Sequence, residues 1–283
     1  METPKRQDIE LNLFVQALQQ CHGYDFSQYA PASFKRRVQA LVDHFGLANI
    51  SQLTERIVHS DDVVPDVIAR LSAPVSDMFR DPSVFACLRR DVLPILASYP
   101  HINIWQAGCA HGEEVYSLAI LLIEAGLYER TQIYATDISA HALDVAREGI
   151  YPARNLQNWA ANYLQAGGQR TLSDYFHARY GHLKLDESLR RNVVFAAHNL
   201  AADAVFCEAQ LILCRNVLIY FRPSLQQRAI ALFRDSLVRG GYLCLGTKES
   251  LSLTSHAGAF TVVDGRNSLY RLADGDGSRI MET

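Results

Sequence analysis

One segment constrains the fold of this chain more than any other. Residues 102–118 read I-N-I-W-Q-A-G-C-A-H-G-E-E-V-Y-S-L, so an apolar run enters a turn that contains Gly108 and Gly112 and then a helix that opens on two carboxylates. A second apolar run, I-Y-A-T-D, follows that helix and ends in Asp137. This order of strand, glycine turn, helix and acid-ended strand is typical of a nucleotide-type α/β site.

The charge of the turn indicates which ligand it accepts. A dinucleotide fold places pyrophosphate on a G-x-G-x-x-G turn, where the free N–H groups of a helix attract anions. Here the spacing is G-x-x-x-G, and Glu113 and Glu114 stand where a phosphate would arrive and would repel it. A ligand with a ribose, an amino group and a sulfonium fits better, so we expect S-adenosylmethionine, with Asp137 facing its ribose. The alternative is that the two glutamates only favour a helix start.

Composition excludes several classes of function. The 283 residues are 49% hydrophobic and 20% charged, which suits a globular protein of two domains. The net charge of −3 gives no sign of nucleic-acid binding. No apolar run approaches the ~20 residues of a membrane span, and the polar N-terminus is no signal peptide. We therefore expect a cytoplasmic monomer without membrane insertion, and the spacing of cysteines and histidines predicts no metal site.

Hydrophobic periodicity divides the chain into parts. Residues 1–72 are predicted to form a helical domain, because apolar residues recur at helical spacing in two runs: Leu11, Phe14, Val15 and Leu18, then Phe34, Val38, Leu41, Val42 and Phe45. Further helices are predicted at 51–59 and 65–71, and another at 84–96 after a connector bracketed by Pro74 and Pro82.

From Ile102 onward, strands and helices alternate. Strands are predicted at 102–107, 131–136, 193–197, 210–214 and 241–246, with helices at 112–125, 139–148 and 224–238. Continuous apolar strands indicate a parallel sheet covered on both faces, and D-G-R-N joins two last strands as a hairpin. We expect an α/β fold, a class I (Rossmann-like) methyltransferase sheet with an antiparallel C-terminal hairpin, preceded by the small all-helical domain.

Two segments stand outside the alternation. The stretch 152–192 is predicted to contain helices plus an excursion of short strands at about 170–192, beside the methyltransferase domain of 91–274. Residues 275–283 are predicted to be a flexible tail.

The chain resembles the CheR-type chemotaxis receptor methyltransferases, a family of S-adenosylmethionine-dependent protein-glutamate O-methyltransferases. The landmarks that carry the resemblance stand in order along nearly the whole chain: M-F-R-D-P (78–82), A-G-C-A-H-G-E-E-V-Y-S-L-A (107–119), A-T-D-I (135–138), G-I-Y (149–151), N-L (199–200), L-C-R-N-V-L-I-Y-F (213–221) and G-T-K-E-S-L (246–251).

The resemblance implies a set of site residues. Arg80 and Tyr220 would stand next to the transferring methyl group, and the connector 73–90 would close over the cofactor. The implied cofactor-binding residues are Pro74, Ser76, Arg80, Gly108, Glu114, Asp137, Asn199, Leu200, Arg215 and Asn216. Three positions depart from the family pattern: Pro74 replaces a common asparagine, His111 a small hydroxyl residue and Lys248 a serine.

The chemistry of carboxyl methylation agrees with an arginine at the site. A glutamate is already ionised at neutral pH, so the nucleophile needs no general base, only alignment and exclusion of water. A guanidinium orients a carboxylate in bidentate geometry, and Arg80 and Arg215 are the candidates. The alternatives are that Arg80 merely pairs with Asp81 and that Tyr220 is a packed aromatic residue.

The resemblance also implies a partner, the cytoplasmic domain of chemoreceptors. Lys35, Arg36 and Arg37 would form an exposed basic face for acidic receptor helices, with an ordinary solvated face as the alternative. Some family members grip a receptor's C-terminal pentapeptide with a three-stranded subdomain. The excursion at 170–192 leaves little room for three strands, so we expect no need for that tether.

Two other functions remain compatible with the residues. One is methyl transfer to a different protein in another sensory array. The other is a cofactor-binding scaffold or signalling protein with weak or no methyl transfer, for which the departures at Pro74 and His111 leave room.

Overall fold

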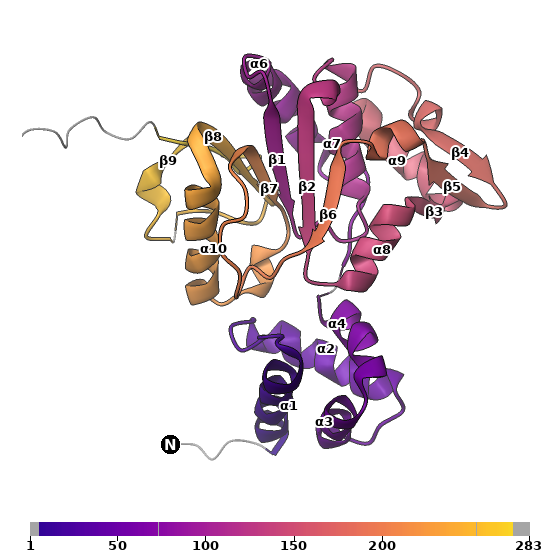
Figure 1. Ribbon diagram of the computed structural model, residues 1–283, viewed down its shortest axis with the longest axis vertical. Coiled ribbons are helices and arrows are strands. Elements are labelled where there is room, and N and C mark those ends of the chain that lie inside the picture. Colours follow the sequence, from indigo (N-terminus) through magenta and orange to yellow (C-terminus); the bar gives the residue numbers. More distant parts are fainter. Residues whose placement is uncertain (1–5, 73, 253, 274–283) are drawn as a thin grey trace, which may run out of the picture.

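The N-terminal part of the computed structural model is a bundle of four helices. The model describes residues 6–72, 74–252 and 254–273, so the predicted tail 275–283 lies outside the described residues. The helices of the bundle are α1 (Arg6–His22), α2 (Pro31–His44), α3 (Ile50–His59) and α4 (Val64–Ser72) (Figure 1). Their apolar faces meet in one core, and the Asn49 side chain caps α3 by accepting from the backbone N–H of Gln52 at 3.0 Å.

A seven-stranded sheet forms the second part, with strand order β6-β2-β1-β7-β8-β10-β9. The strands from β6 to β8 are parallel to one another, and β10 is antiparallel to both of its neighbours. Their bounds are β1 (Ile102–Ala107), β2 (Thr131–Asp137), β6 (Val193–Ala197), β7 (Ala209–Cys214), β8 (Leu237–Leu245), β9 (Phe260–Asp264) and β10 (Leu269–Leu272). The predicted fold class, with its antiparallel hairpin, is confirmed.

Helices cover both faces of the sheet, which explains why its strands are almost continuously apolar. Ile104 points into the core beneath the helices of one face, while its neighbour Trp105 points into the core shared by α10 and the N-terminal helices. The indole N–H of Trp105 donates to the hydroxyl of Thr136 at 2.9 Å, so this buried polar group is paired. The helices are α7 (Glu113–Glu124), α8 (Ala140–Glu148), α9 (Leu156–Gln165) and α10 (Pro223–Ser236).

The helix predicted at 84–96 contains a change of hydrogen-bond pattern. The structure divides it into α5 (Pro82–Cys87), a π-helical segment (Leu88–Val92) and α6 (Leu93–Leu96). Pro94 has no N–H to donate to the preceding turn, which accounts for the shift from the regular ladder at this place.

A second, three-stranded sheet corrects one expectation. It has the order β3-β5-β4, with β3 (Ile150–Pro152), β5 (His182–Leu185) and β4 (Phe176–Arg179). We expected too little room for three strands, and that was wrong, because β3 comes from residues before the excursion. Gly149, with φ +61°, turns the chain from α8 into β3. The length of the excursion therefore does not exclude a peptide-binding sheet.

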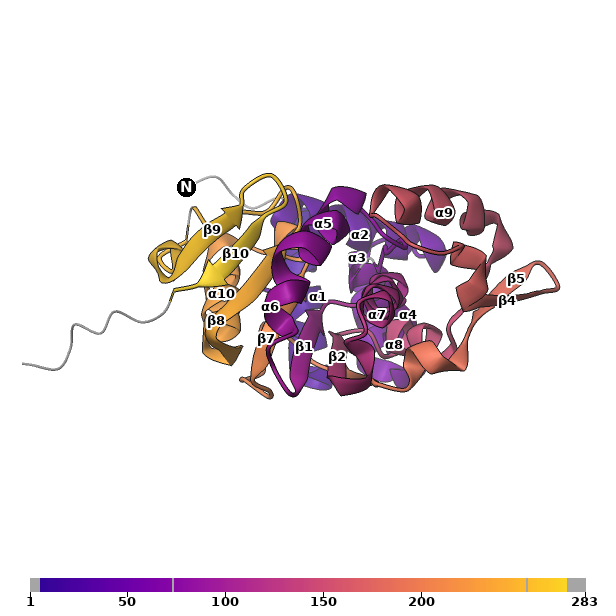
Figure 2. The same ribbon diagram turned by 90° about the horizontal axis from the view of Figure 1, so that it is seen from above.

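The helical domain lies beneath the carboxyl ends of the parallel strands (Figure 1). Ligands of parallel α/β sheets bind at those ends, so both domains border the candidate site. The hairpin β9–β10 and the three-stranded sheet lie at opposite ends of the molecule (Figure 2). Among the described residues, none of the helices is long and apolar enough to cross a membrane.

Candidate active site

The glycine turn after β1 is packed too tightly for side chains. Gly108 and Gly112 have φ values of +73° and +90°. A Cβ on Gly108 would lie 2.4 Å from a methyl group of Val217, and one on Gly112 would lie 2.9 Å from the Cβ of Ala146. The amides of Gly108 and Cys109 both donate to the carbonyl of Thr136, at 2.8 and 2.9 Å. The turn is thereby held against the end of β2, as its glycine spacing requires.

Asp137 is fixed at the end of β2 with its carboxylate in a cavity. Its two oxygens accept from the backbone amides of Ala110 and Ser139, each at 2.9 Å. Burial raises the pKa of Asp137, and these hydrogen bonds partly oppose that rise. Each oxygen retains a lone pair, so the group can still accept hydrogen bonds from a ligand.

Two adjoining cavities contain every predicted catalytic and cofactor-binding residue. The larger has a volume of about 640 Å³, which includes space open to solvent. Its lining includes Pro74, Gly108, Asp137, Asn199, Leu200, Arg215, Asn216 and Tyr220. The smaller, of about 270 Å³, shares Gly108, Arg215 and Asn216 with it and adds Ser76, Arg80 and Glu114. Strand ends, connector and glycine turn therefore meet at one place, although this placement alone assigns no role.

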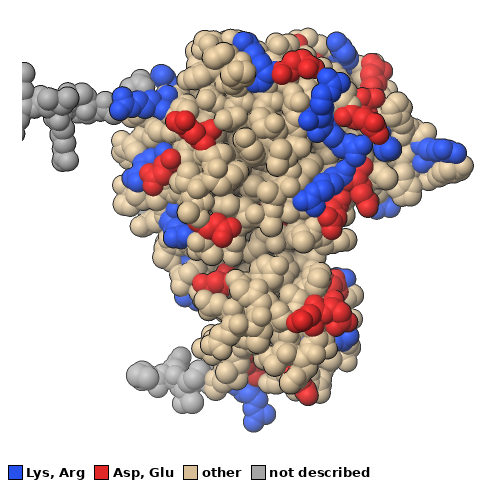
Figure 3. Space-filling view, viewed as in Figure 1, with Lys and Arg blue, Asp and Glu red and all other residues tan. Residues whose placement is uncertain are grey.

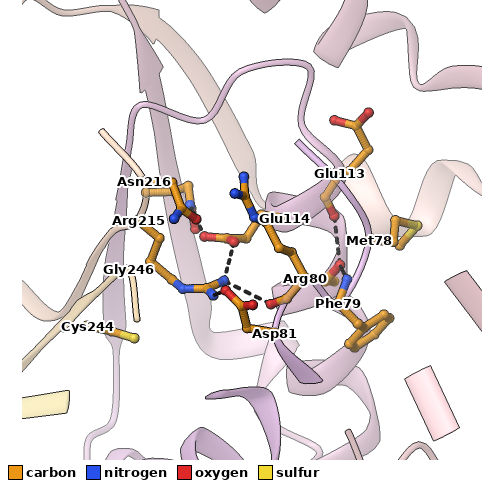
Figure 4. Close-up of polar contacts among 12 residues, drawn as sticks. Met78, Phe79, Arg80, Asp81, Glu113, Glu114, Arg215, Asn216, Cys244 and Gly246 are labelled. Carbon is orange, nitrogen blue, oxygen red and sulfur yellow. Dashed lines mark hydrogen bonds and ion pairs between the residues drawn. The ribbon is translucent and has the colours of Figure 1, made fainter. Parts of the chain in front are cut away.

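Arg215 is the buried centre of an ion-pair network (Figure 4). Its side chain is 0% exposed and donates to the carboxylates of Glu114 and Asp81, the second at 2.6 Å, and to the carbonyl of Arg80 at 3.1 Å. Burial lowers the pKa of Arg215, but the neighbouring carboxylates more than compensate and hold it above its usual value. Arg215 is thus a fixed cation that ties the connector to α7.

The side chain of Arg80 has a different environment, although its backbone carbonyl belongs to the same network. Its guanidinium donates to the carbonyl of Val75 at 3.3 Å and extends away from that of Arg215 (Figure 4). No ion pair of Arg80 occurs within the described part of the chain. The alternative in which Arg80 pairs with Asp81 is wrong, because Asp81 pairs with Arg215.

The backbone around Arg80 is strained. Phe79 and Asp81 have φ values of +50° and +54°, which non-glycine residues rarely adopt. The conformation is held by a hydrogen bond of 2.9 Å from the Phe79 amide to the hydroxyl of Ser117, and by burial of the Phe79 ring against Phe85. Strain that the surroundings enforce in this way is a common feature of functional sites.

Glu249 anchors the loop after β7, and sequence reasoning assigned it no role. Its carboxylate accepts from the amides of Gly246 at 2.7 Å, Asn216 at 3.0 Å and Ile219 at 3.1 Å. Burial raises the pKa of Glu249, and these amides oppose the rise. The available signal was the string G-T-K-E-S-L after a predicted strand, which places this acid near the strand ends.

Unpaired polar atoms gather around the two cavities. In the part of the chain that the structure describes, Gln106 Oε1, His198 Nδ1, Arg215 Nε and Asn216 Oδ1 are buried without a hydrogen-bond partner, and all four residues line a cavity. Native interiors satisfy most such atoms, so these four are available to a polar ligand. The predominance of acceptors suits the amino and hydroxyl groups of S-adenosylmethionine.

Arg37 is partly buried and contacts a residue of the candidate site. Its guanidinium lies 4.4 Å from the ring centroid of Tyr220, a cation–π contact, and also donates to the carbonyl of Leu71. The expectation that Lys35, Arg36 and Arg37 share one basic face is therefore wrong, since consecutive helical residues point in different directions. Lys35 is half-buried and pairs with Asp8 at 2.7 Å, and Arg36 is exposed.

Comparison with known proteins finds two family models that together match most of the chain. Residues 74–269 match the CheR methyltransferase, SAM binding domain, and residues 9–72 match the CheR methyltransferase, all-alpha domain. A Pseudomonas putida protein whose name assigns it provisionally as the methyltransferase Cher3 is 46% identical over 271 residues, which cover 96% of this chain and 99% of that protein.

Two further comparisons concern a chemotaxis protein and a solved structure. A chemotaxis protein methyltransferase of Vibrio parahaemolyticus is 33% identical over 237 residues, 81% of this chain and 83% of the relative. The N-methyltransferase NodS from Bradyrhizobium japonicum, solved with S-adenosyl-L-homocysteine, is 13% identical and covers 70% of this chain and 89% of that one. The TM-score of this comparison is 0.38.

Proposed function

The chain belongs to the CheR methyltransferase family, with S-adenosylmethionine as its cofactor, and from this premise we propose that it methylates glutamate side chains of chemoreceptors. S-adenosylmethionine supplies an electrophilic methyl group on a sulfonium, and attack by a carboxylate gives a methyl ester and S-adenosylhomocysteine without a proton transfer. The protein's task is to hold the acceptor carboxylate in line and to keep water away.

The observation that carries this proposal is the environment of Arg80. Its guanidinium lines the smaller cavity beside Glu114, yet among the described residues its one hydrogen bond is to the carbonyl of Val75. A guanidinium with spare donors matches a carboxylate in bidentate geometry. Arg80 is therefore proposed to orient the acceptor, while Arg215, whose two terminal nitrogens already donate within the protein, keeps the backbone of Arg80 in place.

Other residues of the site are proposed to bind the cofactor. Glu114 carries a negative charge beside Arg215 and faces the cavity where the methionyl part would lie. Asp137 would accept from the ribose, and Asn199 and Leu200 would border the adenine. Tyr220, with Arg37 stacked on its ring, would stand beside the methyl group.

A surface groove offers the acceptor a route to this site. The groove, of about 720 Å³, lies between α2, α4 and the connector and is lined by small apolar residues with Arg37, Arg70 and His111. It shares Pro74 and Val75 with the larger cavity, so the two lie next to each other. The arginines give the groove positive charge, and an acidic protein segment is complementary to it.

The docking role of Lys35 and Arg36 remains part of the proposal. On the face seen in Figure 3, lysines and arginines lie interleaved with acidic residues. The proposed docking therefore depends on complementary charges at α2 and in the groove. It does not depend on a broad basic surface of that face.

Transfer of radiolabelled methyl from S-adenosylmethionine to receptor cytoplasmic domains tests the proposal. We expect label on receptors whose methylation segments carry glutamates, release of that label as methanol by mild alkali, and no label when those glutamates are replaced by glutamine. Arg80→Ala should abolish transfer. Arg239→Ala, which changes an exposed arginine at the start of β8, serves as the matched control.

Two results would contradict the proposal. Label that survives alkali would place the methyl group on something other than a carboxylate. Binding of the cofactor without transfer to any receptor domain would instead favour the scaffold alternative.

A further inference from the structure

The segment between α1 and α2 pairs with the loop after β7. The Ala30 amide donates to the carbonyl of Tyr220 at 2.7 Å, and the Arg222 amide donates to the carbonyl of Gln28 at 2.8 Å. Tyr29 and Phe221 form an antiparallel bridge between these hydrogen bonds. A residue of the N-terminal helical domain is thus fixed against the same loop that carries Arg215 and Tyr220.

The side chain of Tyr29 reaches the larger cavity. Its ring is 8% exposed, packs edge-on against Phe221 and Phe26 with centroid separations of 5.1 and 4.7 Å, and lines the cavity together with Asp137. No hydrogen bond of the Tyr29 hydroxyl occurs among the residues that the structure describes.

The hydroxyl of Tyr29 is a hydrogen-bond donor at neutral pH. Burial raises the pKa of Tyr29, and the charge of Asp137, which lines the same cavity, raises it further. A ribose hydroxyl both donates and accepts, so it can donate to the carboxylate of Asp137 and accept from the phenol of Tyr29.

We propose that Tyr29 is a cofactor-binding residue, so that the N-terminal helical domain forms one wall of the S-adenosylmethionine site and does not serve receptor docking alone. This inference rests on the proposed placement of the cofactor in the larger cavity. A consequence is that cofactor binding strengthens the contact between the helical domain and the domain of the parallel sheet. That contact strengthens cofactor binding in turn, because linkage between two equilibria is reciprocal.

Calorimetry with S-adenosylhomocysteine on the full chain tests the contact. Tyr29→Phe removes only the hydroxyl and should raise Kd roughly five-fold, the size expected for one hydrogen bond. That loss should disappear with an analogue that lacks the contacted 2′- or 3′-hydroxyl. Tyr24→Phe is the matched control, because Tyr24 lies in the same segment and lines a separate cavity with His22 and Asp61.

Asp137→Ala separates the two ways in which the proposal can fail. If Asp137→Ala weakens binding while Tyr29→Phe and Tyr29→Ala bind like the wild type, Tyr29 makes no contact and this inference is overturned. If Asp137→Ala also binds like the wild type, the placement of the cofactor is itself wrong. Thermal unfolding without ligand shows whether each variant is folded.

Amide hydrogen exchange tests the linkage between cofactor and domain. S-adenosylhomocysteine should slow exchange of the Ala30 and Arg222 amides, which form the hydrogen bonds between the domains, in the wild type and less so in Tyr29→Ala. Exchange that the ligand leaves unchanged in the wild type would overturn the linkage.

Discussion

Arg80 and Arg215 have the same chemical group but opposite environments, and this difference defines the site at the scale of residues. The side chain of Arg215 is fully buried and pairs with two carboxylates, whereas Arg80 keeps donors for a ligand. Removing Arg80 should therefore affect the reaction, whereas removing Arg215 would leave Glu114 and Asp81 without their shared partner and destabilise the fold.

Arg80→Ala should lower kcat by a factor of at least about 100, so that no transfer is detected, and change the Kd of S-adenosylmethionine much less, since misplaced reacting groups cost that much or more. Arg80→Lys should recover part of the loss, because it restores charge without the bidentate fork. Steady-state kinetics and calorimetry on the same preparations separate the two effects. Unchanged turnover in Arg80→Ala would remove this residue from the reaction.

Asp137 should make cofactor binding sensitive to mild acid. Its raised pKa means that it takes up a proton at a higher pH than an exposed aspartate does, and a protonated carboxyl is a poorer acceptor for ribose hydroxyls. The affinity for S-adenosylhomocysteine should thus fall with pH below neutrality in the wild type. Asp137→Asn should bind weakly with a flatter dependence on pH.

The sign of this effect distinguishes weaker binding from unfolding. Because the pKa of Asp137 is raised in the folded state, its protonation favours the folded protein as the pH falls. Weaker binding in that range, measured by calorimetry while circular dichroism stays constant, would be the expected pattern. An affinity that stays level down to the pKa of ordinary aspartates would contradict it.

At the residue scale, the sequence predicted the acids and arginines because each follows a strand or turn in a recognisable string. Gln106 and His198 were missed, because a polar residue inside or just after an apolar strand has no local pattern that marks it. Their unpaired atoms became visible only when the surrounding side chains were in place.

At the scale of elements, the loop after β7 depends on one buried carboxylate. Glu249→Gln replaces an acceptor with a donor that faces backbone amides, so we expect a loss of about 1–3 kcal/mol in the free energy of unfolding and a lower kcat. Denaturant unfolding measures the first and methyl transfer the second. Glu187→Gln, at an exposed position, is the control, and equal stability of both variants would contradict the anchoring role.

Helix α2 is expected to contribute to receptor docking through charge. Lys35→Glu combined with Arg36→Glu should raise the KM for receptor and leave the Kd of the cofactor unchanged. Added salt should produce a similar rise, because exposed charges are screened over ~8 Å at physiological ionic strength. Normal receptor kinetics in the double variant would place docking elsewhere. Arg37 is kept out of this test, because it contacts Tyr220.

The elements themselves were predictable where their apolar periodicity was long. The five parallel strands and the hairpin follow from continuous apolar runs and a turn signal. Strand β3 has three residues, too few for a periodic pattern, and its partner β5 lies beyond α9 in the sequence. The register of Ile150 with Lys184 is a long-range contact that local propensity does not contain.

At the scale of the whole molecule, the site lies where the two domains meet. The sheet supplies Asp137 and Arg215, the connector supplies Arg80, and the helical domain supplies Arg37 and Tyr29. Sequence periodicity separated the domains but did not show their contact, since the bridge between Tyr29 and Phe221 joins segments far apart in the chain.

The central claim is that the assembled site esterifies glutamate carboxylates of chemoreceptors, and mass-spectrometric mapping of the methylated residue tests it most directly. A receptor cytoplasmic domain is incubated with S-adenosylmethionine and the wild-type protein or Arg80→Ala, then digested under acidic conditions that preserve esters. We expect the mass of one methylene group on specific glutamates, present with the wild type and absent with Arg80→Ala. The same added mass on a lysine, an asparagine or a terminus, with every glutamate unmodified, would contradict the claim.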